Sequence, residues 1–424
     1  MRRTNIIRIC PAKKQEKILR LMGDRVSALW NAANYLYRQS YFKNERVPSY
    51  EKSYHLFKTQ DDYKALPTHI AQEGLKKLSK AWKSYFELLR LYKTGRLQDK
   101  PGLPKYRKDR KIGERPFNYI PIQSTRAYSL ENGCLNITLP KDIRNGRLSI
   151  PFKGIIRYCG SFKTCELKYE PAARKWYAHI VVEVSEPQRK ERPIKYAAAD
   201  LGARRIIAAS IQDSSINHVF HSKQLRKDYK YWTRQIAEEQ SRLSNCTGTK
   251  TSRKLKQLYR MRGLRFKHGL ETLSSNLVSL LKRKGVTQFK IGYPKNCRED
   301  MHFGRNNGLV HNFWSFDKLL RILEKHCKRR GINLERINEA GTSDICHICG
   351  LPVRRPMRSV VICPIHGRMH ADVNASLNML KRYTPVYGDR AKAAPAWITH
   401  EWNKHLWLPH AKSLKYIQNL QVAA

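Results

Sequence analysis

The spacing of hydrophobic positions divides the first half of the chain into a helical part and a β part. Residues 5–10 form a short strand pattern, and apolar side chains then recur at helical spacing over 11–33 and again over 67–92. From 116 to 184 the pattern changes to short runs separated by turn residues. Such runs predict a small antiparallel β domain after the helical segment.

The second half of the chain alternates between strands and helices. A buried-type strand over 196–200 and a second strand over 205–211 are joined by a tight turn. Farther on, a strand over 286–291, a helix over 315–330 and a strand over 332–337 follow one another. This alternation predicts an α/β domain.

The charge of the chain gives the first indication of a partner. Its 424 residues include 83 Lys and Arg against 34 Asp and Glu, a formal net charge of +49. An excess of this size, spread along the chain, favours a nucleic-acid partner, because neutralising phosphates releases counterions. The alternatives are a merely basic protein or a surface that meets anionic lipid.

The composition argues against several other classes of protein. Hydrophobic residues make up 41% of the chain, enough for ordinary cores and too many for a largely disordered protein. No apolar stretch reaches the ~18 residues of a membrane span, and residues 1–14 lack the apolar region of a signal peptide. Seven of the ten cysteines are scattered singly, which is typical of a reducing, intracellular compartment.

Four potential metal ligands lie close together near residue 350. They form a C-x2-C pair and, after 13 residues, a C-x2-H pair: Cys346, Cys349, Cys363 and His366. Soft ligands in two such pairs suit tetrahedral zinc, and a site with all four positions filled is typically structural. His347 and His370 are rival donors, so the fourth ligand stays open at this point.

Two aspartates stand where a metal-dependent nuclease would need acids. Asp200 ends the first strand of the α/β segment, and Asp372 opens a helical run after the cysteine pairs. Phosphodiester hydrolysis by two metal ions needs several carboxylates that converge from different elements. Taken singly, each residue also has an ordinary interpretation, since aspartates are frequent in turns and as helix caps.

The surroundings of these residues carry a family resemblance. The RuvC-like core of TnpB proteins and of compact type V CRISPR effectors resembles this chain in three segments: Asp200-Leu-Gly202, Thr342-Ser343 with Cys346-x-x-Cys349-Gly350, and Ala371-Asp372-Val373-Asn374-Ala375. The start of the chain is similar to the amino-terminal strand and helix of the same family, through Arg8-Ile-Cys-Pro11, Gln15 and Trp30-Asn31. The resemblance covers most of residues 1–383.

This resemblance implies an α/β fold plus a β-barrel and a helical lobe. An RNase H-like (RuvC) mixed sheet with an inserted zinc ribbon would follow an antiparallel β-barrel, the wedge, which a helical recognition lobe interrupts. The implied divisions are the first wedge strand (1–10), the recognition lobe (11–114), the rest of the wedge (115–190), the RuvC-like core (191–340), the zinc ribbon (341–369), the last RuvC-like helix (370–385) and a tail of unknown role (386–424).

The activity that the resemblance implies is RNA-guided, Mg²⁺-dependent cleavage of DNA next to a short flanking motif, with guide pairing reading the sequence. The implied partners are a guide RNA, double-stranded target DNA and its displaced single strand, and no membrane. Catalytic Mg²⁺ and structural Zn²⁺ are the implied cofactors. The implied location is the cytoplasm of a prokaryote, at the nucleoid.

One departure from the family concerns the middle catalytic carboxylate. The family usually places a glutamate at the end of the strand after the long helix, whereas this strand ends Lys290-Ile-Gly-Tyr-Pro-Lys295, with Glu299 and Asp300 farther on. Glu339 is the better replacement, because an acid at the end of the neighbouring strand can reach the same metals, an arrangement that resembles a subset of TnpB-like proteins. We therefore expect Asp200, Glu339 and Asp372 to hold Mg²⁺.

Two other functions stay open. The missing glutamate favours a nuclease-dead, RNA-guided DNA-binding protein that acts as a repressor, whereas the retained Asp200 and Asp372 favour cleavage. A zinc-ribbon protein that binds nucleic acid without a guide would need both aspartate motifs to be accidental. Co-purified RNA of defined length would separate it from the other two.

Basic segments supply candidate contacts with nucleic acid. Residues 223–234 interleave lysines and arginines with Tyr229, Tyr231 and Trp232, a mixture that can neutralise phosphates and stack bases. The same mixture fits a helix that buries its aromatic side chains and exposes its charges. We expect 93–111 and 250–267 to contact phosphates, because a self-repelling basic run gains little otherwise.

Overall fold

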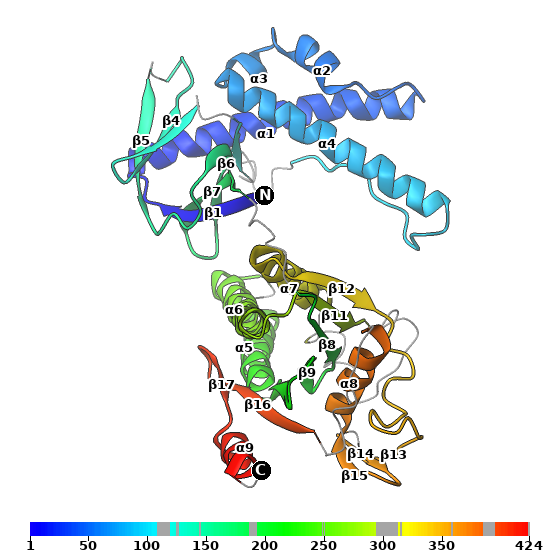
Figure 1. Ribbon diagram of the computed structural model, residues 1–424. Coiled ribbons are helices and arrows are strands. Elements are labelled where there is room, and N and C mark those ends of the chain that lie inside the picture. The colour runs from blue at the N-terminus through cyan, green and yellow to red at the C-terminus, as the bar shows by residue number, and fades with distance from the viewer. Residues whose placement is uncertain are drawn as a thin grey trace. The chain divides into compact units, whose positions relative to one another are not determined.

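The computed structural model describes residues 1–107, 119–123, 127–143, 146–185, 193–247, 249, 251–293, 313, 316–357, 359–384 and 395–422. The chain forms two compact units, Met1–Ser185 and Glu186–Ala424, which are considered one at a time (Figure 1). Within the described ranges, no helix is long and apolar enough to cross a membrane.

A curled, seven-stranded antiparallel sheet forms the β part of the first unit (Figure 1). Its order is β2-β6-β7-β1-β5-β4-β3. The strands are β1 (Arg2–Ile9), β2 (Ile120–Ile122), β3 (Tyr128–Glu131), β4 (Cys134–Thr138), β5 (Arg147–Lys153), β6 (Ser161–Glu170) and β7 (Lys175–Glu183). Ile7 and Ile9 of β1 are buried while their neighbours face outward, as in a strand with one buried face. The amino-terminal strand thus belongs to the expected antiparallel β domain.

Along the chain, four helices follow β1 before the other strands of this sheet begin. They are α1 (Lys13–Phe42), α2 (Tyr50–Phe57), α3 (Asp61–Lys64) and α4 (Thr68–Lys93). Tyr37 of α1 and Trp82 of α4 are fully buried with ring centroids 6.0 Å apart, and the Trp82 indole donates to Asn34 Oδ1 at 3.0 Å. The two predicted helices are confirmed, and the first continues to Phe42 because its buried positions continue through Tyr37.

The connector after α4 is fastened to α1 through its backbone. Asn34 Nδ2 and Arg38 Nη2 donate to the Pro104 carbonyl at 3.0 and 2.8 Å. Asn31 accepts from the Arg107 amide at 2.8 Å and donates to the Arg107 carbonyl at 2.9 Å. Polar side chains of α1 therefore satisfy the backbone of this otherwise irregular segment.

Arg107 is an internal residue and does not offer its charge to a partner. Its guanidinium lies 4.2 Å from the ring centroid of Trp30 and 4.6 Å from that of Tyr119, and the residue is 6% exposed. Our expectation that 93–111 contacts phosphates is therefore wrong for Arg107, because two aromatic faces already bind its cation. Residues 108–111 lie outside the described part of the chain.

Replacing Arg107 with lysine should lower the melting temperature by roughly 4–8 °C, which corresponds to about 2 kcal/mol in a unit of this size. Lysine keeps the charge and loses the planar stacking and the 2.8 Å hydrogen bond to the Tyr119 hydroxyl. Thermal unfolding followed by circular dichroism measures the change. Arg96→Lys, at an exposed position of the same connector, is the control, and equal melting temperatures would contradict the role given to Arg107.

The second unit is built on a mixed sheet of order β12-β11-β8-β9-β10-β16-β17. The strands are β8 (Tyr196–Leu201), β9 (Arg205–Ile211), β10 (Ile216–His221), β11 (Gln288–Gly292), β12 (Asn333–Ile337), β16 (Ala396–Trp402) and β17 (Trp407–Pro409). β8 pairs in parallel with β11 and antiparallel with β9, and β11 pairs in parallel with β12. The predicted α/β domain with a mixed sheet is confirmed.

Helices cover the two faces of this sheet (Figure 1). One face packs on α5 (Lys223–Thr247), α6 (Arg253–Arg283) and α7 (Phe316–Arg330), and the other packs on α8 (Ala371–Tyr383). Along β8, Ala197 and Ala199 belong to the first core while Ala198 packs towards α8. Because side chains alternate along a strand, Asp200 lies on the α8 face.

The segment that the sequence pattern left unassigned extends this sheet. β16 pairs in parallel with β10 at the edge of the sheet, and β17 pairs with β16. Trp402 and Trp407 are 2% exposed, and the Trp407 indole donates to the Gly269 carbonyl of α6 at 2.8 Å. α9 (Ala411–Val422) follows. Trp402 and Trp407 thus anchor these two strands to the core, and β16 covers the edge of β10 that would otherwise be exposed.

Candidate metal centres

Asp200 stands at the end of β8, where the chain turns sharply into β9. Gly202 allows this turn, because a Cβ there would lie 2.8 Å from the carbonyl oxygen of Arg205. The side chain of Asp200 is directed to the α8 face, as described above. The Asp-x-Gly pattern therefore reflects both an acid at the strand end and a turn that only glycine accommodates.

The side chain of Glu339 lies over the end of β11, the strand that ends in glycine where the family usually has a glutamate. β11 ends at Gly292, which is paired with Ile337 of β12. A Cβ on Gly292 would lie 2.8 Å from Glu339 Oε2 and 2.9 Å from Met379 Sδ. The carboxylate that follows β12 therefore lies over the end of β11, where the sequence places glycine.

Asp372 lies in the first turn of α8, close to two arginines. Its Oδ2 atom is 3.5 Å from Nε of Arg205, which begins β9. The positive charges of Arg205 and Arg355 oppose the effect of burial on the pKa of Asp372, and Arg355 does the same for Asp200. Sequence patterns did not indicate either arginine, because each comes from a different element and neither belongs to a motif.

The three carboxylates act on one another electrostatically. Burial raises the pKa of Asp200 well above its ordinary value, and the charges of Asp372 and Glu339 raise it further. Burial also raises the pKa of Glu339 to about 7 and raises that of Asp372. Buried acids that repel one another are stabilised in their charged form by a bound cation, so the arrangement has the electrostatics of a divalent-metal site.

The donor set also fits such an ion. Carboxylate oxygens are ligands that Mg²⁺ prefers, and Glu339 Oε2 is buried without a hydrogen-bond partner in the described part of the chain. The three acids are not gathered as tightly as the cysteine–histidine group described below, whose ligand atoms all lie within 4.8 Å of one another. A wider arrangement is what two ions ~4 Å apart require.

The Mg²⁺-free protein should lose stability as the pH rises from 5 to 8. The folded-state pKa of Glu339, about 7, lies above its ordinary value of 4.5. Between these values the folded chain holds a proton that the unfolded chain releases, so stability falls with pH, by at most about 3 kcal/mol from this group. Thermal melts in buffer that contains neither Mg²⁺ nor a chelator, so that zinc is retained, measure the slope. Glu339→Gln should make the slope shallower, while Asp200 and Asp372, whose pKa values are also raised, leave a remainder. An unchanged slope would contradict the assignment.

The second centre lies beside a small three-stranded sheet, β13 (Arg354–Met357), β14 (Val360–Cys363) and β15 (Gly367–His370). One pair of donors comes from a turn that precedes β13, and the other comes from the turn between β14 and β15. The four donors converge: Cys346, Cys349, Cys363 and His366. Cys349 Sγ lies 3.5 Å from Cys363 Sγ, and His366 Nδ1 lies 3.7 Å from Cys346 Sγ and 3.6 Å from Cys363 Sγ. This group can hold a metal ion, and its soft donors suit zinc.

The two rival histidines have other partners. Asn374 Oδ1 accepts from the backbone amide of His347 at 2.9 Å and lies 3.0 Å from its Nδ1. His370 is the N-cap of α8, and its side chain accepts from the Val373 amide at 3.4 Å. His366 is therefore the histidine that completes the cluster.

Two asparagines of α8 connect the two centres. Asn374 Nδ2 donates to the Ile345 carbonyl at 2.8 Å, and Asn378 Nδ2 donates to the carbonyls of Thr342 and Ile345, each at 2.8 Å. Both asparagines are buried. The Asn of the Asp-x-Asn-Ala motif thus holds the cysteine-bearing segment against the helix that carries Asp372, a role that the motif alone did not reveal.

The sequence predicts that residues 223–234 either stack bases or bury their aromatic side chains, and the aromatic residues of α5 include both buried and exposed ones. Tyr229 packs in the core, with its ring centroid 5.4 Å from that of Phe266 and 5.3 Å from that of Phe313. Trp232 is half-buried, and Tyr231 is 56% exposed. Tyr231 therefore stays available to a partner, whereas Tyr229 does not.

Comparison with known proteins agrees with this architecture. Residues 179–298 match a family described as "Probable transposase", and residues 316–379 match the family described as "Cas12f1-like, TNB domain". A TnpB-like protein of Acidianus two-tailed virus is 29% identical over 94% of this chain and 90% of its own length. The two family matches thus contain Asp200 and both metal-ligand pairs, and the viral relative aligns along nearly the whole chain.

A solved structure shares the fold. The Cas12f1 chain in a cryo-EM structure titled as its complex with sgRNA and target DNA superposes with a TM-score of 0.58 at 13% identity, covering 87% of this chain and 83% of that one. The expected fold class is thereby confirmed, with the curled antiparallel sheet, the mixed sheet and the helices in place. The chain is therefore similar in sequence to the transposase and Cas12f1-like families and to a viral TnpB-like protein, and it is similar in fold to Cas12f1.

Proposed function

We propose that this chain is an RNA-guided DNA endonuclease whose RuvC-like site consists of Asp200, Glu339 and Asp372. TnpB and Cas12 proteins are RuvC-like nucleases, so the similarity of this chain to them supports a nuclease of this type. The observation that carries the proposal is the Glu339 carboxylate over Gly292, buried and without a hydrogen-bond partner in the described chain. Burying a carboxylate without a partner costs folding free energy, and a cation bound between these acids would offset that cost.

The three acids would hold Mg²⁺, which activates a water molecule and stabilises the leaving oxygen when bound. Asp200 and Glu339 come from neighbouring parts of one sheet, and Asp372 comes from the helix that covers it. Arg205 and Arg355 bring positive charge to the same region, where the phosphate of a substrate would add negative charge. The chain's own residues thus supply both a metal-binding face and a phosphate-binding edge.

The remaining roles follow from the same proposal. The cysteine–histidine cluster would hold structural Zn²⁺, and the first unit would act as wedge and recognition lobe within the divisions expected from the sequence. A guide RNA, target DNA and its displaced strand would neutralise the net charge of +49. The similar Cas12f1 structure is titled as a complex with sgRNA and target DNA, which supports partners of both kinds. The site of action would be the prokaryotic cytoplasm, at the nucleoid.

Sequencing the RNA that co-purifies with the chain, expressed with its flanking DNA, tests the guide. The complex with Mg²⁺ is then offered a library of targets that match this RNA and differ in the flanking sequence. We expect cleavage that disappears in Asp200→Ala. Tight guide-dependent binding without cleavage would support the repressor-like alternative, and absence of RNA of defined length would support a zinc-ribbon protein without a guide.

A comparison of two glutamine variants locates the third acid. Glu339→Gln should strongly reduce cleavage, whereas Glu299→Gln should leave it unchanged. Glu299 and Asp300 lie outside the described residues, so the structure itself does not compare them with Glu339. Full activity in Glu339→Gln would overturn the assignment.

A further inference from the structure

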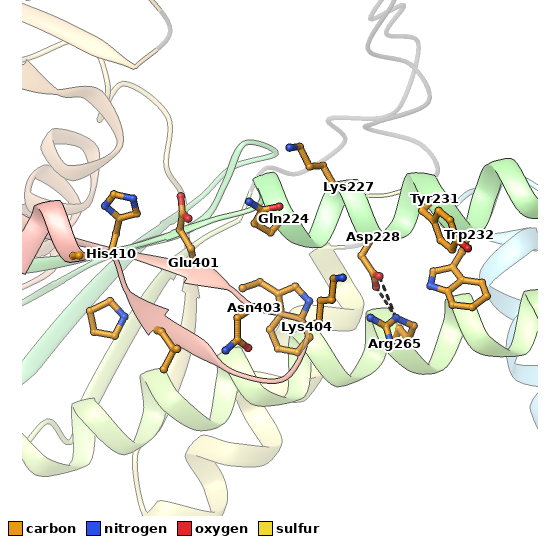
Figure 2. Close-up of a pocket in the computed structure, with 14 residues that line it drawn as sticks. Gln224, Lys227, Asp228, Tyr231, Trp232, Arg265, Glu401, Asn403, Lys404 and His410 are labelled. Atoms are coloured by element: carbon orange, nitrogen blue, oxygen red, sulfur yellow. Dashed lines mark hydrogen bonds and ion pairs between the residues drawn. The ribbon is translucent and has the colours of Figure 1, made fainter.

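A cavity of about 930 Å³ lies in the second unit between α5, α6 and the strands of the C-terminal segment. Figure 2 shows Tyr231 and Trp232 of α5 at one end, Lys404 and Asn403 of the β16–β17 turn near the middle, and Glu401 and His410 at the other end. The wall contributed by the C-terminal segment lies beyond residue 379, where the second family match ends. This part of the cavity therefore belongs to neither family match.

The cavity joins aromatic surface to positive charge. Tyr231 is 56% exposed, so its ring face is open to a ligand. Lys227 and Lys404 are exposed and form no ion pair with any described residue, whereas Arg265 is neutralised by Asp228 through contacts of 2.9 and 3.1 Å. An aromatic face beside unneutralised ammonium groups binds the base and the phosphate of a nucleotide.

The backbone holds Lys404 in an unusual conformation at the edge of this cavity. Its φ is 79°, a value that side chains of this size rarely adopt. Asn403 Oδ1 fixes the turn by accepting from the amides of His405 and Leu406 at 3.0 and 2.7 Å. The turn therefore presents the lysine at a cost in backbone strain, a feature that clusters at ligand-binding sites.

The cavity adjoins the carboxyl end of β16, at the same edge of the sheet as the strand end that carries Asp200, although α5 and α6 cover the face opposite to α8. β10 and β16 run in the direction of β8, so Asp200 and Glu401 both lie at carboxyl ends. Three strand spacings separate β8 from β16, or ~14 Å. Between the two sites, Glu401 is paired with His221, His221 with Arg205, and Arg205 contacts Asp372. At the axial rise of a strand in duplex DNA, ~3.4 Å per phosphate, this distance corresponds to about four nucleotides, and a more extended single strand covers it in fewer.

We propose that this cavity holds one nucleotide of the single DNA strand that enters the nuclease site, with its base on Tyr231 and Trp232 and its phosphate on Lys227 and Lys404. This inference rests on the proposed nuclease function. The position favours the DNA strand over the guide, because a strand whose scissile phosphate lies at Asp200 and Asp372 reaches the cavity by passing over this edge of the sheet. The C-terminal segment is then a binding element of the nuclease and more than a cover for its sheet.

Photocrosslinking tests the proposal without requiring cleavage. The full-length Asp200→Ala chain, with the RNA that co-purifies, is irradiated with a 20-nucleotide single-stranded DNA carrying one 5-iodouracil, and the crosslinked peptides are identified by mass spectrometry. We expect a crosslink in the α5 peptide that contains Tyr231 and Trp232. Lys404→Gln should reduce its yield about fivefold or more, as the loss of a phosphate contact beside a stacked base implies. Tyr231→Phe should retain it, because the ring face remains.

Matched variants separate this cavity from the general charge of the protein. Lys412→Gln removes an exposed lysine of α9 that does not line the cavity, and Tyr259→Ala removes an exposed tyrosine of α6. Neither should change the yield; an equal loss in Lys412→Gln and Lys404→Gln would overturn the proposal. So would stronger crosslinking of the matching 5-iodouridine RNA than of the DNA. If the wild-type complex fails to cleave but the α5 crosslink forms, the nuclease proposal fails and the binding site stands.

Discussion

Cleavage by the Glu339→Gln variant should fall by about a thousandfold, equivalent to about 4 kcal/mol of activation free energy. Glutamine keeps the size of the side chain and removes the charge with which a carboxylate binds a divalent cation. The measurement is single-turnover cleavage of a guide-matched DNA in Mg²⁺. Glu335→Gln is the matched control, since Glu335 lies on β12 but is exposed and paired with Lys290. Equal rates for the two variants would refute the role of Glu339.

The geometry at Gly292 permits a stricter test of the same idea. A side chain on Gly292 collides with Glu339 Oε2 and with the flexible end of Met379, so Gly292→Glu alone should impair cleavage. Combined with Glu339→Ala, which vacates the space, Gly292→Glu returns an acid to β11, and cleavage should recover to above the level of Glu339→Ala. The contradicting result is a double variant that still melts cooperatively but cleaves no faster than Glu339→Ala. That result would show that an acid at the end of β11 cannot replace one after β12.

Replacing Cys363 with serine should reduce bound zinc from about one ion per chain to almost none and unfold the segment around it. The buried apolar group here is small: Cys346, Val361, Cys363, Met369 and Ala371. A core of this size cannot stabilise three short strands, so metal binding must supply the folding free energy, which for structural zinc is of the order of 10 kcal/mol. Metal analysis and protection of the 342–370 amides from hydrogen exchange measure both effects.

Controls for the zinc prediction come from the same chain. Cys159→Ser changes an exposed cysteine of the first unit and should retain the metal. His366→Cys should also retain it, because a thiolate replaces the imidazole in a site of the same shape. His347→Gln tests the rival ligand, and loss of zinc in that variant with retention in His366→Gln would reverse the assignment.

Sequence patterns predicted the two halves of the chain and most of the elements around the sites. The alternation over 196–211 marks β8 and β9, and the glycine after Asp200 marks the turn between them, because these features depend on neighbours in the chain. The pair spacing predicts the cysteine–histidine cluster for the same reason. The fourth donor stayed open among three histidines, since spacing does not say that His347 and His370 have partners elsewhere.

The tertiary structure decided what depends on residues far apart in the sequence. The position of Glu339 over Gly292 follows from the parallel pairing of β11 with β12, and the proximity of Arg205 to Asp372 follows from the packing of α8 on β9. The burial of Arg107 between two aromatic rings overrode an expectation based on charge, because a basic run does not reveal which cation turns inward. β16 pairs with β10 from 180 residues away along the chain, and β17 then pairs with β16, through backbone hydrogen bonds that carry no local signature. The sequence by itself therefore determined the resemblance to TnpB proteins, the chemistry of the donors and the local turns that present them, and only the folded chain decided which donors meet.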